Sequence, residues 1–299
     1  MSSVQQDSPR QFSCAVVIPT KSRPRLLIAA VLSALEAVRP VGGEVVVIDD
    51  NGTPSAQDSL AGIDGLGRDL RIFRNLSAAG PSGARNFGAS KTRSPVIFFL
   101  DDDDRMLPDY CRRILEGPLK NAKAPDFGFS DAVGGRSPLR TLGSGAVPND
   151  LPVRLRTAAL CMGVWIRREV FLAIGGVSED ISMNEDTELF LRLAKAGYRG
   201  WYEQAPGVRL RDSSAPVGEL ASMTRSSRPD ERARSFELIL SRHHDILEQD
   251  PHFLREIQHR IVKYHIRSGE RRKAIDFAAS QPGNVAGLLL HAVSRPGFI

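Results

Sequence analysis

The 299-residue sequence has few cysteines, no long apolar run and few aromatic residues. Its three cysteines, Cys14, Cys111 and Cys161, lie far apart and match no metal-binding or redox spacing. No apolar run approaches the roughly 20 residues of a membrane-spanning helix, and the polar residues 1–11 hold no apolar core of a secretory signal. The sequence therefore argues against a disulfide scaffold, a zinc module or a membrane span. A cytoplasmic location is expected, with peripheral contact at the inner membrane face left open.

The charge pattern also argues against nucleic-acid binding. The net charge is +5, and most of the 40 basic residues are arginine. They form no block of five or six like charges, and aromatic residues make up only 6% of the chain. With 41% hydrophobic and 25% charged residues, the composition is that of a globular protein.

The first hundred residues alternate between two kinds of apolar pattern. Short continuous apolar runs are interleaved with segments in which apolar residues recur at helical spacing. This alternation is typical of buried parallel strands connected by helices, and so of an α/β sheet. We expect strands at residues 14–19, 44–49, 70–73 and 96–100, and helices at residues 24–39 and 81–92.

Polar residues follow three of these expected strands. They are Thr20–Arg23, Asp49–Asn51 and Asp101–Asp104. Functional loops of such sheets lie at the carboxyl ends of the strands, so these residues predict a ligand crevice. Asp and Asn are also ordinary turn residues, and turn formation is an alternative interpretation of Asp49–Asn51.

Four consecutive aspartates at 101–104 are the strongest single signal. Alternation along an extended chain would point Asp101 and Asp103 to one side, where both could act on one cation. All six histidines lie beyond residue 242, so a metal at this strand end would be held by oxygen ligands, which favours Mg²⁺ or Mn²⁺ over zinc. A solvated acidic turn before a helix near Pro108 is the alternative.

Two further segments have the pattern of helix starts. Gly80–Gly88 is glycine-rich, so backbone N–H groups could meet an anion there and Arg85 could reach a phosphate. A packed helix start explains the same residues. Asn184–Glu188 opens an amphipathic helix, where acidic residues stabilise the first turn. Capping accounts for two of the three carboxylates in this segment. The third is a candidate for the general base.

The remainder of the chain is less regular. Residues 135–158 are rich in Gly, Ser, Pro and Arg and are expected to form a loop, a candidate lid over the acceptor. Beyond Pro216 the apolar spacing predicts two or three helices, followed by short helices near 271–279 and 286–293. The histidines of this part are expected to be surface or packing residues.

In their order and spacing, these motifs resemble family 2 glycosyltransferases over about residues 13–212. The resemblance implies a GT-A fold, which is Rossmann-like, together with a nucleotide-sugar donor, a divalent metal and an inverting single displacement. The segments that carry it are Val16–Thr20, Val47–Gly52, Gly83–Gly88, Phe99–Asp104, Arg167–Gly176 and Asn184–Leu189.

The resemblance also implies roles for individual residues. Asp186 would be the general base, and Glu185 would orient the acceptor or support its loop. Asp103 would be the direct metal ligand, with Asp101 beside it and nearer the ribose. The donor-binding residues would be Pro19, Thr20, Arg23, Asp49, Asp50, Arg85, Asp101 and Asp102.

We therefore expect an α/β GT-A domain over residues 12–215 and a helical extension over 216–299. The expected activity is metal-dependent transfer of a sugar, most often from a UDP donor in this family, to a sugar or glycoconjugate acceptor, in polysaccharide or glycoconjugate biosynthesis. A homo-oligomer is compatible with the sequence.

Two alternatives stay open at this point. A nucleotidyltransferase would carry a glycine-rich basic loop directly after the first strand, where this chain has Thr-Lys-Ser-Arg-Pro. A non-catalytic nucleotide-sugar-binding protein would bind donor without turnover and would not need both Asp103 and Asp186.

Overall fold

The computed structural model describes residues 12–77, 79–135, 137–156, 163–211, 227–281 and 287. The chain divides into two compact units. The first comprises Met1–Ala146, Cys161–Gly176 and Arg199–Ser213, and the second comprises Val147–Leu160, Val177–Tyr198 and Ser214–Ile299. The expected domain boundary at residue 215 lies outside the described residues and stays a prediction.

Within the described residues, the first unit is built on a nine-stranded sheet of order β3-β2-β1-β4-β8-β6-β9-β5, with β7 paired to β9. Strands β3, β2, β1 and β4 are parallel, and β8 runs antiparallel to β4 and β6. All four apolar runs expected to be strands are strands. The bounds are β1 Ala15–Thr20, β2 Glu44–Asp49, β3 Leu70–Arg74, β4 Val96–Phe99, β5 Arg105–Met106, β6 Phe127–Val133, β7 Gly145–Ala146, β8 Trp165–Arg167 and β9 Gly200–Arg209.

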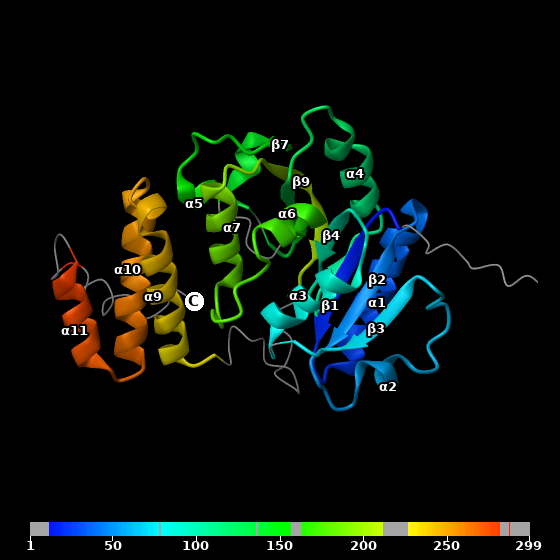
Figure 1. Ribbon diagram of the computed structural model, residues 1–299, viewed down its shortest axis with the longest axis horizontal. Helices are drawn as coiled ribbons and strands as arrows, with labels where there is room; N and C mark the ends of the chain where they lie inside the picture. The colour runs from blue at the N-terminus through cyan, green and yellow to red at the C-terminus, as the bar shows by residue number, and fades with distance from the viewer. Residues whose placement is uncertain are drawn as a thin grey trace, which may run out of the picture. The chain divides into compact units, whose positions relative to one another are not determined.

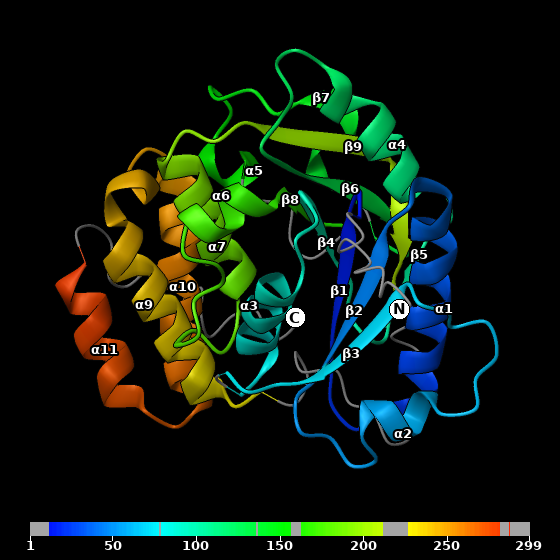
Figure 2. The ribbon, with the colours of Figure 1, turned by 45° about the vertical axis from the view of Figure 1, so that its right-hand side comes forward.

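Helices α1 (Pro24–Val38) and α3 (Pro81–Lys91) lie against opposite faces of β1 and β2, as Figure 2 shows. Both match the predicted helices. Shorter helices of this unit are α2 (Ala56–Leu60), α4 (Tyr110–Glu116) and α6 (Arg168–Ala173).

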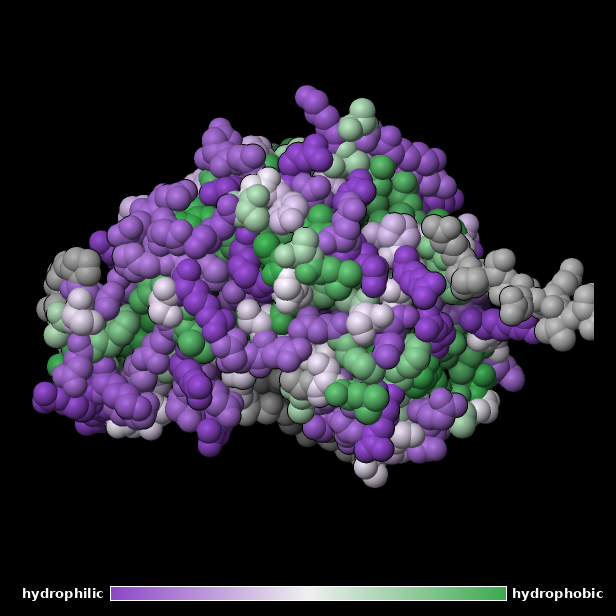
Figure 3. All heavy atoms as spheres, viewed as in Figure 1, coloured by the Kyte–Doolittle hydropathy of each residue, from purple (hydrophilic) through white to green (hydrophobic). Residues whose placement is uncertain are grey.

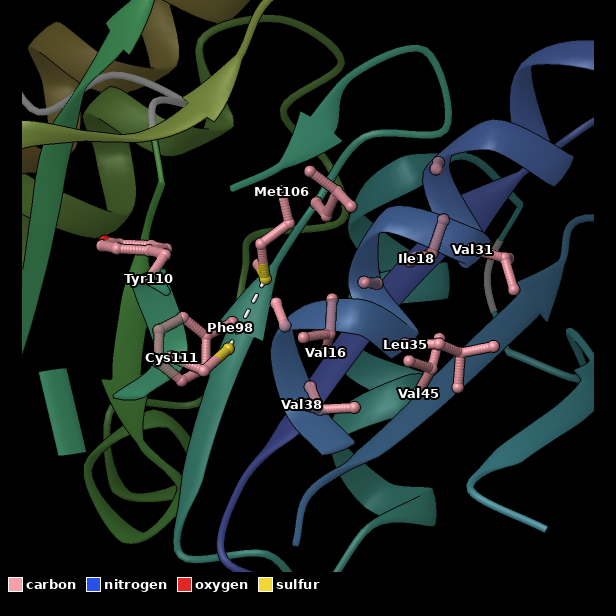
Figure 4. Close-up of a cluster of buried hydrophobic side chains, with 14 of the residues drawn as sticks. Val16, Ile18, Val31, Leu35, Val38, Val45, Phe98, Met106, Tyr110 and Cys111 are labelled. Carbon is pink, nitrogen blue, oxygen red and sulfur yellow. Dashed lines mark hydrogen bonds between the residues drawn. The ribbon is translucent and has the colours of Figure 1, made fainter. Parts of the chain in front are cut away.

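The main core lies between α1, the sheet and α4. Apolar residues of α1 recur every three or four positions, so one face of the helix is apolar and buried. Figure 4 shows Val31, Leu35 and Val38 from this face packed near Val16 and Ile18 of β1. Strands β1 and β2 are buried on both faces of the sheet, and their apolar runs are therefore continuous. This is why the apolar runs predicted them correctly.

On the other face, Gly88 brings α3 very close to β1. A Cβ atom on Gly88 would lie 2.4 Å from Cγ1 of Val17 and 3.2 Å from Cγ1 of Ile48. Only a glycine fits this contact without a shift of the helix, so Gly88 sets the position of α3 and of the residues at its start.

Part of the segment expected to be a loop is ordered against the sheet. Residues Pro138–Leu142 form a 3₁₀ helix and Gly145–Ala146 form β7, which pairs with β9. The Ser137 amide donates to Asp131, and the Ser144 hydroxyl donates to Glu203. The expectation of a continuous loop over 135–158 is therefore wrong for these two elements and for the short helix Val153–Arg156. Composition alone could not show the polar contacts that hold them.

The second unit is helical. Helices α9 (Pro229–Leu247), α10 (Pro251–Arg267) and α11 (Arg271–Ser280) lie side by side (Figure 1). The unit also contains α5 (Val153–Arg156) and α7 (Glu185–Lys195). The helices expected in the tail are confirmed up to residue 280, and the one expected near 286–293 lies outside the described residues except for residue 287.

One apolar core joins α7, α9 and α10, and a smaller cluster joins α10 and α11. Leu191 of α7 packs with buried residues of α9 and α10 that include Phe236, Ile239, Ile257 and Ile261. The outward face of α9 and α10 is mainly hydrophilic (Figure 3). Within the described part of the chain, no helix is long and apolar enough to cross a bilayer.

Candidate functional site

The loops after β1 and β4 meet at the carboxyl edge of the sheet. Because these strands are parallel neighbours, their ends lie together. The Thr20 hydroxyl donates to Asp102 at 2.7 Å, and Nη1 of Arg23 donates to the other oxygen of Asp102 at 2.9 Å. Asp102 is buried. The structure therefore brings together three of the residues that the sequence assigned to donor binding.

Helix α3 supplies a second guanidinium to the same acidic loop. Nη2 of Arg85 lies 2.7 Å from Oδ1 of Asp101. The side chain of Arg85 is 12% exposed and that of Asp101 is 40% exposed, so this pair borders on solvent. The glycine-rich start of α3 thus places a cation beside the aspartates, and contact of Arg85 with a phosphate stays a prediction.

Three of the four aspartates could share one cation. Asp101, Asp103 and Asp104 each offer a carboxylate oxygen, and these atoms all lie within 4.8 Å of one another. A set of carboxylate oxygens suits Mg²⁺ or Mn²⁺, so the residues present fit such an ion. Asp104 was not among the ligands expected from the sequence, because strand alternation alone pointed it away from Asp101 and Asp103.

The electrostatics of the loop agree with that fit. Burial raises the pKa of Asp104 to about 7, with the charges of Asp101 and Asp103 adding to the rise and a hydrogen bond from the Arg211 amide opposing it. Burial also raises the pKa values of Asp102 and Asp103, and Arg23 opposes both shifts. The cluster holds more negative charge than its arginines balance, a situation that a bound cation relieves.

Asp49 and Asp50 organise neighbouring loops. The two oxygens of Asp49 accept the backbone N–H groups of Gly52 and Ala56, each at 2.7 Å. Asp50 accepts from the Asn75 amide at 2.8 Å and from the Gly80 backbone N–H at 3.0 Å. Asp49 thus performs the turn-forming role that the sequence left open.

Pro19 and Asp50 complete the predicted residues at this edge. Pro19 lies within β1, is buried and pairs with Ile48 of β2. By accepting the Gly80 amide, Asp50 fixes the residue that precedes α3, the helix that carries Arg85. Donor contact by Pro19, Asp49 and Asp50 stays a prediction.

The predicted base belongs to the second unit. Asn184 adopts a left-handed conformation (φ 63°), and α7 begins at the next residue. Glu185 and Asp186 occupy the first turn and are partly buried. One oxygen of Asp186 accepts the Thr187 amide at 2.6 Å. The helix N-terminus stabilises an ionised carboxylate at this position.

Glu188, which the sequence analysis interpreted as a helix-start acid, has buried partners that the sequence reasoning missed. It is buried at the end of the first turn of α7, and both of its oxygens accept hydrogen bonds. Burial raises its pKa, but hydrogen bonds from His243, Arg192 and Ser178 outweigh burial and lower the pKa to about 2. The signal available in the sequence was the spacing of four between Glu188 and Arg192 on one helix.

Part of the sheet-bearing region matches a known protein family. Residues 15–145 match the model of Glycosyl transferase family 2. The succinoglycan biosynthesis protein ExoU of Rhizobium meliloti is 36% identical over 118 residues, which cover 39% of this chain and 34% of that protein. The chain thus spans about a third of the length of this curated relative.

Solved structures share the fold. Staphylococcus aureus TarS in complex with UDP-GlcNAc aligns with a TM-score of 0.63 at 13% identity, over 94% of this chain and 80% of that one. The mannosyltransferase PcManGT from Pyrobaculum calidifontis, in complex with GDP-Man and Mn²⁺, aligns with a TM-score of 0.53 at 18% identity, over 96% and 81% of the two chains. The resemblance to family 2 glycosyltransferases and the expected GT-A fold with a helical C-terminal region are confirmed.

Proposed function

We propose that this protein is a metal-dependent, inverting glycosyltransferase that moves a sugar from a nucleoside-diphosphate donor to an acceptor hydroxyl. The observation that carries the proposal is the acidic cluster Asp101–Asp104 at the sheet edge, bordered by Arg23 and Arg85. The match to the family 2 model and the relatives named as biosynthesis proteins or glycosyltransferases support it.

The acidic cluster would hold the donor diphosphate through a divalent cation. Asp103 and Asp101 are the proposed ligands, and Asp104 is close enough to join them. A bound cation would supply charge stabilisation for the departing nucleoside diphosphate. Arg85 donates a hydrogen bond to Asp101, and its guanidinium would donate to a phosphate of the bound donor. Thr20 and Arg23 hold Asp102 in place behind the ligands.

Asp186 is the proposed general base. It would remove the proton from the acceptor hydroxyl as the oxygen attacks the anomeric carbon from the face opposite the leaving group. It lies in the first turn of α7, where the positive end of the helix dipole favours a carboxylate side chain. Glu185, beside it, is proposed to orient the acceptor.

The comparisons support a donor class and an acceptor class for this proposal. TarS is solved with UDP-GlcNAc and PcManGT with GDP-Man, so a UDP-sugar or a GDP-sugar is the proposed donor. ExoU is named for succinoglycan biosynthesis, and a growing polysaccharide or glycoconjugate is the proposed acceptor.

A ligand screen followed by a turnover assay tests the proposal. Melting temperatures are measured with Mn²⁺ and a panel of nucleotide sugars, because a ligand that binds the native state raises stability by mass action. The stabilising donor is then incubated with sugar acceptors or water. Release of nucleoside diphosphate with an inverted sugar product is expected. Release of pyrophosphate would indicate a nucleotidyltransferase, and binding without turnover would indicate a non-catalytic binding protein.

A further inference from the structure

The helical unit holds the segment that carries Asp186 through two adjacent residues of α9. Nε2 of His243 lies 3.1 Å from Oε1 of Glu188. Nη1 and Nη2 of Arg242 contact the carboxylate of Asp180. Asp180 precedes α7, and Glu188 lies at the end of its first turn. The two contacts therefore fix this segment at both ends.

Of the two carboxylates that contact α9, that of Glu188 is the more deeply buried. Its side chain is 2% exposed and that of His243 is 5% exposed. Besides His243, Glu188 accepts hydrogen bonds from the Ser178 hydroxyl at 2.6 Å and from Arg192 at 2.7–2.9 Å. Both oxygens of the carboxylate thus accept hydrogen bonds, and these bonds connect the loop before α7, α7 itself and α9.

The contact with His243 is specific to its place in α9. The backbone of α9 leaves helical values at this residue (φ −125°, ψ 19°), and the ring contacts Glu188 from there. Nδ1 of the ring is buried and has no hydrogen-bond partner among the described residues. The hydrogen bond to Glu188 is thus the polar contact that holds the imidazole, with the N–H at Nε2 donating to the carboxylate oxygen.

Helix geometry links this anchor to Asp186. Successive residues of an α-helix turn by about 100°, so residues two positions apart lie on nearly opposite faces. Anchoring Glu188 against α9 therefore fixes the rotation of α7 about its axis, and with it the direction of Asp186. A base must come within about 3 Å of the proton that it removes, and a displacement of about 1 Å can cost 10²-fold in rate.

We propose that His243 is a positioning residue for catalysis, acting through Glu188 to aim Asp186. The inference rests on the proposed function, because it assumes that Asp186 is the base. It assigns α9 a part in the chemistry through the contact between His243 and Glu188.

The test compares two buried histidines of the same unit. His265 of α10 is buried like His243 and contacts Glu237 at 2.7 Å and Glu270 at 3.0 Å, neither of which belongs to α7. Both His243→Gln and His265→Gln lose a buried imidazole held by carboxylates, so both are expected to lower the melting temperature. Only His243→Gln is expected to lower kcat, by roughly 10–100-fold, with KM for the donor unchanged.

A double variant identifies the route of the effect. If His243 acts through Asp186, adding His243→Gln to Asp186→Asn should lower kcat no further, because there is no base left to aim. Ser178→Ala, which removes one hydrogen bond and no charge, provides a variant that is expected to fold and to show a smaller loss of kcat.

The outcomes separate this inference from the proposed function. Equal kcat losses in the His243 and His265 variants, or a full further loss in the double variant, would overturn the positioning role while leaving the transferase intact. A normal rate in Asp186→Asn would overturn the base assignment and the inference with it. Absence of turnover in the wild-type protein with every donor would overturn the proposed function itself.

Discussion

Nη1 of Arg23 lies 2.9 Å from Oδ1 of Asp102 and 3.4 Å from Oδ2 of Asp103. One guanidinium after β1 therefore spans two neighbouring carboxylates after β4. Arg23 balances part of the charge of the acidic loop and holds Asp102 in its buried position, while Asp103 keeps an oxygen near those of Asp101 and Asp104. Asp102 thus shapes the loop, whereas Asp101, Asp103 and Asp104 can bind a cation.

Replacing Asp103 with asparagine should weaken binding of Mn²⁺. The change removes one of three clustered carboxylates while keeping the size of the side chain. Calorimetric titration of Mn²⁺ in the presence of nucleoside diphosphate is expected to show at least a tenfold loss of affinity, and transfer should fall with it. Asp58→Asn, an exposed carboxylate on α2, serves as the control. Unchanged Mn²⁺ affinity in Asp103→Asn, or full transfer activity in excess chelator, would contradict the metal site.

Replacing Asp186 with asparagine should slow transfer by roughly 10²–10⁴-fold, the usual contribution of general-base catalysis. Asparagine can still accept the Thr187 amide, so the start of α7 should persist. Donor and Mn²⁺ affinities, measured by titration, should change little. Glu185→Gln should cost less, since Glu185 only orients the acceptor. A loss of donor affinity in proportion to the loss of rate would argue against a base at this position.

The stability of the protein should fall in acid partly because of Glu188. Its pKa is lowered from 4.5 to about 2 in the folded state. A lowered folded-state pKa gives a stabilising contribution that is complete above pH 4.5 and is lost as the pH falls toward 2. The shift corresponds to about 3 kcal/mol. The charged groups near Glu188 are Arg192 on its own helix, Arg242 on α9 and Asp180 in the preceding loop, and the His243 imidazole contacts it from α9.

Chemical denaturation between pH 6 and pH 3 measures this contribution. Glu188→Gln should lower the free energy of unfolding at pH 6, and the difference from wild type should shrink as the pH decreases. Asp245→Asn is the matched control, because Asp245 also pairs with a cation of α7, Lys195, but at the surface. A difference between wild type and Glu188→Gln that stays constant down to pH 3 would show that Glu188 does not titrate as described.

Gly88→Ala should destabilise the first unit. The added methyl group would approach Cγ1 of Val17 to 2.4 Å, so α3 or β1 must move. Overpacking of this kind costs about 1–3 kcal/mol, to be measured by thermal or chemical unfolding. Because α3 carries Arg85, donor affinity should decline as well. Gly145→Ala, in a strand position with nothing within 4 Å of the added carbon, should leave stability nearly unchanged.

Much of the sheet and of the acidic site was visible in the sequence. Continuous apolar runs such as Val96–Leu100 must be buried on both faces, so they predicted parallel strands without any knowledge of partners. Asp101–Asp104 follows directly from the end of such a strand, and strand ends of a parallel sheet gather at one edge. The local pattern therefore located the candidate metal site, the helix that carries Arg85 and the start of α7.

The tertiary structure alone decided the contacts between segments distant in the chain. Asp104 joins the cluster because the chain turns at Asp102 and Asp103 and the Asp104 amide donates to the Asp101 carbonyl, which strand alternation could not show. Asp49 uses both oxygens on backbone amides, a role that depends on the path of the following loop. Glu188 and His243 are 55 residues apart in the sequence and were read separately as a helix-start acid and a packing histidine. Local periodicity encodes which face of an element is buried, whereas the polar partners of buried groups depend on how the elements pack together.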